Sequence, residues 1–192
     1  MKRLFLAGAL LVGAPAFAQE ANGCPEGSYS VVMSPDGTTL SILFSAFTVE
    51  SGAQAASGPH RKVCRIASPL NLPANQSIGV YKVDYRGFAK LAAKQETELD
   101  VQYFLGPHDK QHGRVFKRRV RGPSEGDYTF TENIGAGQMK RVGCGNDAKL
   151  EVGITLSLDG DLQTGEAMAS LDTADAGPGG ALVYHFDLKK CR

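Results

Sequence analysis

The densest run of charge in this sequence is Arg114–Arg121, which reads Arg-Val-Phe-Lys-Arg-Arg-Val-Arg. Alternate residues of a β-strand face opposite sides, so Lys117, Arg119 and Arg121 would share one face. Together with Arg114, this row of cations predicts a ligand-binding patch for an anionic polysaccharide, a lipopolysaccharide or a nucleic acid. The alternative is a charged edge strand that discourages pairing with another chain. The near-neutral charge of the whole chain favours the edge-strand interpretation.

Two histidines, His108 and His112, lie four residues apart in the segment Pro-His-Asp-Lys-Gln-His-Gly. Histidines at this spacing can chelate a metal ion from one face of a helix, and Asp109 could assist them. The flanking Gly106-Pro107 and Gly113 instead favour a loop, in which the spacing of ligands dictates less. His108 and His112 are the metal-ligand candidates of the sequence, with solvated loop histidines as the favoured alternative.

Tyr81 and Tyr85 are predicted to share one face of a strand, with Val83 between them. Two such rings could form a shallow aromatic platform for a sugar ring. The alternative is that this face packs into the core. The chain has no tryptophan, the largest aromatic side chain, so core packing is favoured over a carbohydrate site.

No catalytic constellation emerges from the remaining polar residues. Hydrolysis of a glycan needs two carboxylates facing each other across a cleft. Four acidic residues are available, but the sequence does not bring any two together: Glu50, Asp84, Glu98 and Asp100. No GxSxG nucleophile elbow is present, and cysteines held in disulfides supply no thiol nucleophile. The sequence therefore leans away from an enzyme without deciding the matter, and no cofactor is expected.

The chain has four cysteines: Cys24, Cys64, Cys144 and Cys191. An even number in an exported protein indicates two disulfides. Three pairings are possible, and we expect Cys24–Cys64 with Cys144–Cys191, because each cysteine lies beside a strand-like segment in its own half of the chain. A zinc site is the alternative, but the sequence has no CxxC or CxxH pair to form a chelating turn.

The scaffold for these residues is a succession of short strand-like runs separated by Gly, Pro, Asp and Asn. Strands are predicted at Tyr29–Met33, Thr38–Glu50, Lys62–Ile66, Gln76–Tyr85, Glu98–Leu105, Arg114–Val120, Tyr128–Asn133, Met139–Cys144, Val152–Leu158, Gly165–Leu171 and Leu182–Leu188. The turn Ser34-Pro35-Asp36-Gly37 joins the first two as a hairpin. Only Ala89–Glu96 is a helix candidate. About ten strands predict an all-β fold, an antiparallel β-sandwich or jelly-roll-like single domain stapled by two disulfides.

Residues 1–18 are predicted to be a signal peptide, which leaves 19–192 as the single domain. Lys2 and Arg3 precede a short apolar run, and Ala16-Phe17-Ala18 offers a cleavage site near Ala18. The run is shorter than the roughly 20 residues that a transmembrane helix needs, so no membrane-spanning segment is expected in the mature chain. The predicted location is secreted or periplasmic. Without Lys2 and Arg3 the 21 basic residues become 19, which nearly balance the 20 acidic residues, and no nucleic-acid partner is expected.

Four segments in this order resemble a secreted family of bacteria and fungi, the "domain of unknown function 4360" (DUF4360) family. They are Gly23–Ser28, Ser34–Phe44, Arg61–Cys64 and Asp84–Phe88. The resemblance covers the whole mature chain. It implies an exported, cysteine-bridged β-domain with no assigned activity, and it carries no catalytic residues over to this chain.

The sequence thus favours a non-enzymatic binding or surface-interaction module, whose expected partner is a glycan, such as an anionic polysaccharide, or another cell-surface polymer. Two alternatives remain. One is a polysaccharide-directed hydrolase that uses paired carboxylates, and the other is a metal-binding secreted protein centred on His108 and His112.

Overall fold

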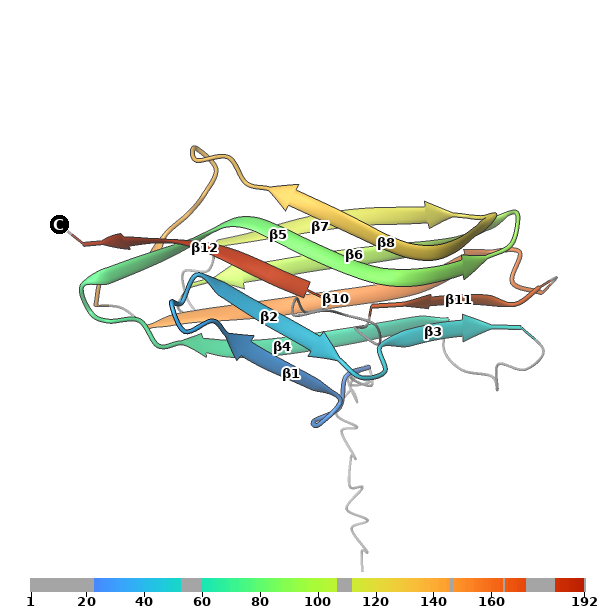
Figure 1. The fold of residues 1–192 in the computed structure, drawn as a ribbon, viewed down its shortest axis with the longest axis horizontal. Helices are drawn as coiled ribbons and strands as arrows, with labels where there is room; N and C mark the ends of the chain where they lie inside the picture. The colour runs from blue at the N-terminus through green and yellow to red at the C-terminus, as the bar shows by residue number, and fades with distance from the viewer. Residues whose placement is uncertain are drawn as a thin grey trace, which may run out of the picture.

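The computed structural model describes residues 23–52, 60–106, 112–145, 147–163, 165–171 and 182–191. These residues form two antiparallel sheets that lie one upon the other (Figure 1). The smaller sheet has four strands in the order β4 (Arg61–Leu70), β10 (Ala148–Gly160), β6 (Gln95–Leu105) and β7 (His112–Arg121). The larger has eight: β1 (Tyr29–Met33), β2 (Thr39–Phe44), β12 (Leu182–Lys190), β5 (Gln76–Leu91), β11 (Ala167–Ser170), β3 (Thr48–Ser51), β8 (Ser124–Asn133) and β9 (Val142–Gly143).

The 16-residue strand β5 organises the larger sheet. Its residues Lys82–Tyr85 pair with both β12 and β8, so these two strands lie on opposite edges of β5. By the same reasoning β11 follows β12 along one edge, and β9 and β8 lie along the other. Strands β2 and β1 extend the sheet beyond β12, and β3 extends it beyond β11.

The core lies between the two sheets, as alternating apolar residues require. On β10, Val152, Ile154 and Leu156 are buried. They pack in one cluster with residues of the larger sheet such as Val83 and Leu182. The all-β, two-sheet fold that the sequence predicts is therefore confirmed, with twelve strands in the described residues in place of about ten.

The predicted helix at Ala89–Glu96 is wrong. Ala89 and Leu91 are buried alternately as the end of β5, and β6 begins at Gln95. Between them the chain turns sharply, with Lys94 at a φ of 67°. The Gln95 side chain accepts a hydrogen bond from the backbone N–H of Ala92 at 2.7 Å, which closes the turn.

The long strand predicted at Thr38–Glu50 is two strands, β2 and β3, with a bend between them. β2 pairs with β12, whereas β3 pairs with β11. Phe47, inside the bend, is 1% exposed and its ring lies 5.2 Å from that of Phe44. Ser45 and Ala46 in the bend are exposed, but the buried Phe47 continues the apolar pattern of β2 into β3, so the break is not visible in the sequence.

Both expected disulfides are present, Cys24–Cys64 and Cys144–Cys191. The first ties the segment before β1 to β4, and the second joins the end of β12 to the loop after β9. The described residues contain no helix with the length and apolarity needed to span a bilayer. The predicted signal peptide lies within residues 1–22, outside the described part of the chain.

Candidate functional site

The basic run lies on β7, the edge strand of the four-stranded sheet, and it alternates as predicted. Lys117, Arg119 and Arg121 are exposed on the outer face. Arg114 lies on the other side of the strand, and its Nη2 donates to the backbone oxygen of Gln138 at 3.0 Å. The four predicted ligand-binding cations of this run therefore do not form one patch.

Carboxylates on the neighbouring strand β6 face the three outer cations. Arg119 Nη2 lies 2.6 Å from Glu98 Oε2, Lys117 Nζ lies 3.2 Å from Asp100 Oδ2, and Arg121 Nε lies 3.3 Å from Glu96 Oε2. We call these six residues the ion-pair ladder. The hydrogen bond from Arg119, with a further one from Lys117, lowers the pKa of Glu98. The ladder offers little net positive charge to an anionic ligand, which fits the edge-strand interpretation.

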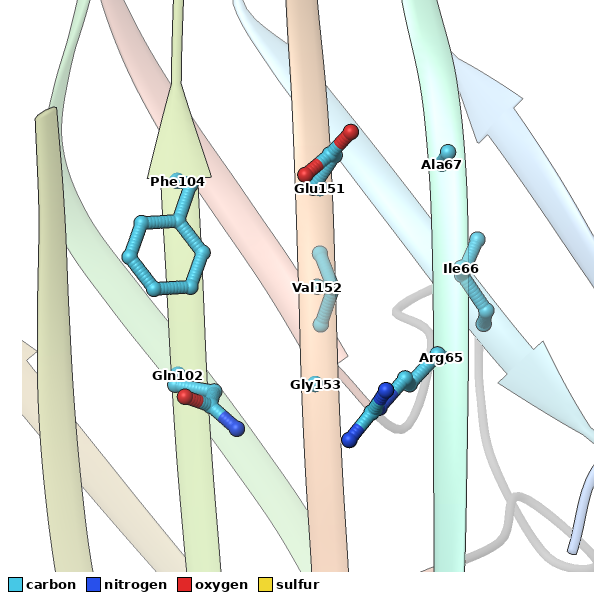
Figure 2. Close-up of a pocket in the computed structure, with 8 residues that line it drawn as sticks. All are labelled: Arg65, Ile66, Ala67, Gln102, Phe104, Glu151, Val152 and Gly153. Carbon is cyan, nitrogen blue, oxygen red and sulfur yellow. The ribbon is translucent and has the colours of Figure 1, made fainter. Parts of the chain in front are cut away.

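Next to the ladder, the same outer face is hollowed, with a volume of about 410 Å³ (Figure 2). The floor is Gly153 in the middle of β10. In the sheet register Gly153 lies between Arg65 on β4 and Gln102 on β6. Figure 2 shows both of these side chains pointing toward Gly153 on β10, one from either side. A Cβ atom on Gly153 would lie 2.7 Å from the amide nitrogen of Gln102, so the glycine makes room for this arrangement.

The next row of residues completes the hollow with Ala67, Glu151 and Phe104. Phe104 covers Gly113 of the edge strand, where a Cβ atom would overlap its ring. Ala67 beside Glu151 and Gly113 beside Phe104 are both small, so they do not fill the space above the sheet. An aromatic ring and several polar groups therefore surround an open floor. Glu151 forms an ion pair with Lys149 from the same strand.

Arg65 differs from the cations of the ladder. It is exposed, and among the described residues no carboxylate lies within ion-pair distance of its guanidinium. Its positive charge is therefore available to a ligand in the hollow. Together the lining groups offer charged and neutral hydrogen-bond donors, a carboxylate acceptor and an aromatic ring. This set suits a polar ring-shaped ligand.

The structure separates Tyr81 and Tyr85, which the sequence predicts on one face. The Tyr81 side chain is 42% exposed, whereas that of Tyr85 is 1% exposed and lies between the sheets. The reason is a β-bulge: Lys82 pairs with His185 and Val80 with Phe186, so Tyr81 is an extra residue that reverses the alternation. The predicted two-tyrosine platform is wrong, and for Tyr85 the core-packing alternative is confirmed.

The bulge lies beside a polar cluster on the outer face of the eight-stranded sheet. Asp84 Oδ2 is 2.7 Å from His185 Nε2 and 2.9 Å from Lys82 Nζ, and Asp84 Oδ1 accepts the Thr131 hydroxyl at 2.6 Å. Burial opposes ionisation of Asp84, but these three hydrogen bonds outweigh it and lower its pKa. An ionised carboxylate with three donors holds neighbouring strands together and is a poor proton donor.

The acidic residues considered for hydrolysis are distributed over the molecule. Asp84 lies on the outer face of the larger sheet, and Glu98 and Asp100 lie on the outer face of the smaller one. Glu98 and Asp100 share a face, but Lys117 Nζ bridges them at 3.3 and 3.2 Å. Glu50 is exposed on β3. This arrangement gives no support to the hydrolase alternative.

The predicted metal site falls largely outside the described residues. His108 is one of the residues 107–111 that are not described, and His112 begins β7 with its backbone paired to Leu105. Within the described ranges, no group of three or more His, Cys, Asp and Glu residues could hold a metal ion.

Sequence reasoning missed the residues of the hollow, chiefly Arg65, Gln102 and Phe104. A signal was present, because glycine inside a strand often marks a place where another group approaches closely. Gly153 lies in the middle of β10, and Gly113 lies near the start of β7. What the sequence lacks is the register that sets these glycines against Phe104 and Gln102 on β6.

Comparison with known proteins identifies relatives without an assigned activity. The model of a family described as "Domain of unknown function (DUF4360)" matches residues 17–191. An "Uncharacterized secreted protein" of the fungus Arthroderma benhamiae is 23% identical over 154 residues, which cover 80% of this chain and 62% of the relative. The matched segment thus spans less than two thirds of the fungal protein.

Proposed function

This chain belongs to the DUF4360 family, and on that premise we propose that it is an exported, non-enzymatic β-sandwich module that binds a glycan or another cell-surface polymer. The observation that carries the proposal is the hollow on the outer face of the four-stranded sheet. Its volume of about 410 Å³ falls within the range of roughly 300–1,000 Å³ that is usual for small-molecule sites.

Export is supported by two observations. The fungal relative is described as a secreted protein. Both pairs of cysteines form disulfides, which persist in oxidising compartments and are rare in the cytosol. Residues 1–18 have the pattern of a signal peptide, so we propose cleavage near Ala18 and a secreted or periplasmic location.

The lining of the hollow supports a glycan as the ligand. Sugar hydroxyls both donate and accept hydrogen bonds, and the hollow offers donors from Arg65 and Gln102 and an acceptor in Glu151. Phe104 supplies an aromatic surface at the rim for the apolar C–H groups of a sugar ring. The open floor lies along strand β10, so a polymer could pass over it in either direction.

We expect the purified protein to bind one or more members of a glycan array or of a panel of insoluble cell-wall polymers. Gly153→Val should abolish this binding, because its side chain would fill the floor and displace Gln102. Thr155→Val is the matched control: it places the same side chain on the same face of β10, two residues from the floor.

Equal thermal unfolding of the two variants would show that the fold is intact. Absence of binding to every glycan and wall polymer would contradict the proposed function. Binding that survives Gly153→Val in a folded protein would place the ligand elsewhere on the molecule.

A further inference from the structure

The cations on the outer face of the four-stranded sheet differ in what surrounds them. Lys117, Arg119 and Arg121 each contact a carboxylate of β6, and Lys149 contacts Glu151. Arg65 differs from these four described side chains because no such carboxylate lies beside it, and it is the cation that lines the hollow and points toward its floor (Figure 2). The hollow thus presents an available positive charge near four cations that each lie beside a carboxylate.

The groups beside Arg65 suit a planar anion. A guanidinium donates two parallel hydrogen bonds to a carboxylate, and this pairing is both strong and geometrically selective. Gln102 approaches the same floor from the opposite strand, and its amide can donate to a ligand oxygen lying over Gly153. A carboxylate above Gly153 would therefore be held from both sides.

Glu151 limits which anions fit. It lies one row from Arg65 and its charge is compensated by Lys149, so it can accept ligand hydroxyls without strongly repelling a single negative charge. A phosphate group carries up to two charges and offers no hydroxyl-rich ring of its own, and it would meet a lone guanidinium with a carboxylate nearby. One guanidinium beside one carboxylate therefore favours, as the ligand, a singly charged carboxylate attached to a polyhydroxylated ring.

We propose that the hollow selects glycans that contain uronic acid units, with Arg65 binding the sugar carboxylate, Gln102 assisting it and Glu151 accepting sugar hydroxyls. The inference rests on the proposed glycan-binding function and names its ligand class. It also moves the anion-binding role from the basic run of β7 to a cation on the opposite edge strand, β4.

The test measures the affinity of the full mature protein for three uronate polymers of different stereochemistry: polygalacturonate, alginate and hyaluronan. Fully methyl-esterified polygalacturonate is the neutral comparison, because it keeps the ring and loses the charge. All titrations use isothermal calorimetry at one ionic strength, since screening weakens exposed charge interactions. Arg65→Gln removes the proposed carboxylate ligand, and Arg121→Gln removes the same charge from the ion-pair ladder at the far end of the same face.

We expect at least one uronate polymer to bind, and its methyl ester to bind about tenfold more weakly or not at all. Arg65→Gln should lower the affinity for the uronate by about the same factor, and Arg121→Gln should change it less than about twofold. Loss of binding in Arg65→Gln but not in Arg121→Gln would support the inference directly.

Three results would overturn the inference. Equal binding of the uronate and its ester, or no binding of any uronate while neutral glycans bind, would leave the proposed function standing without its acidic ligand. An equal loss in Arg121→Gln would assign the charge recognition to the ladder. If no glycan of either kind binds, the proposed function fails together with the inference.

Discussion

Tyr85 and Tyr184 bury their rings in the same core, but their hydroxyl groups have different surroundings. The Tyr85 hydroxyl donates to Glu132, whose other oxygen accepts from Arg118 Nη2 at 2.7 Å. Burial, together with the hydrogen bond to Glu132, raises the pKa of Tyr85. The Tyr184 hydroxyl is fully buried without a hydrogen-bond partner among the described residues. The Tyr85 hydroxyl thus belongs to a hydrogen-bonded polar network. Burial of the Tyr184 hydroxyl instead costs desolvation free energy that no hydrogen bond offsets.

We expect Tyr184→Phe to leave the free energy of unfolding unchanged or to raise it by about 1 kcal/mol, because it removes an unsatisfied buried polar group. Tyr85→Phe is the matched comparison, and it should lower the free energy by about 1–2 kcal/mol by leaving Glu132 short of a donor. Urea denaturation of both variants measures the difference. A clear loss of stability in Tyr184→Phe would show that the Tyr184 hydroxyl makes a stabilising hydrogen bond, and would contradict this expectation.

For single residues, the sequence correctly predicted which face a side chain occupies wherever the strand is regular. Alternation along Arg114–Arg121 correctly separated the outer cations from Phe116, Arg118 and Val120. The same rule failed at Tyr81, because a single bulged residue reverses every side chain after it. A bulge forms through pairing with a partner strand more than 100 residues away, and no local pattern records it.

Among the elements, β6 and β7 show how two neighbouring strands stabilise an exposed edge. The ladder places carboxylates of one strand opposite cations of the next. Cross-strand pairs of opposite charge stabilise a sheet, and charges on an edge also discourage pairing with other chains. The ladder therefore serves the fold, and the ligand-binding role predicted for Lys117, Arg119 and Arg121 stays a prediction.

The ladder predicts a dependence of stability on pH. The pKa of Glu98 is lower in the folded protein than its ordinary value of 4.5, so the folded state binds its proton less readily than the unfolded state. The stabilisation is complete above about pH 4.5 and is lost as the pH falls through the folded pKa. Glu98→Gln should therefore be less stable than the wild type at pH 7 by about 0.5 kcal/mol, and the difference should shrink at acid pH.

Urea denaturation of the two proteins between pH 3 and 7, roughly the range in which carboxylates titrate, checks this expectation. Gln102→Glu, four residues further along the same face of β6, is an informative contrast, because it adds a carboxylate where no ladder cation is opposite. A constant difference between wild type and Glu98→Gln at every pH would show that Glu98 acts through packing and not through charge.

In the molecule as a whole, the two disulfides close loops of similar size but lie in different surroundings. The paired residues are 40 and 47 positions apart, so loop entropy predicts about 4 kcal/mol for each. Cys24 and Cys64 are 1% and 0% exposed, whereas Cys144 is exposed. The Cys24–Cys64 disulfide therefore also contributes to the packing of the core.

We expect the double variant Cys24→Ala, Cys64→Ala to lose more stability than Cys144→Ala, Cys191→Ala, because Cys24 and Cys64 are both buried in the core whereas Cys144 is exposed. Urea denaturation of both variants under the same conditions gives the comparison. Equal losses would indicate that chain entropy alone accounts for both bridges, and a larger loss for the second pair would contradict the expectation.

The sequence by itself determined the class of fold, because period-two alternation and turn residues act locally. It favoured, among three possible pairings, the two disulfides that the structure contains, because each cysteine lies beside a strand-like segment in its own half of the chain. It did not determine the hollow. Gly153, Arg65 and Gln102 come from three strands far apart in the chain, and only the sheet register sets them side by side. The basic run stands out in the sequence, but in the fold carboxylates of β6 form ion pairs with its three outer cations. Arg65 does not stand out in the sequence, yet its charge is the one available at the hollow. Local patterns therefore predicted most of the strands and both disulfides of this β-domain, and long-range pairing decided which charged side chains lie at the hollow.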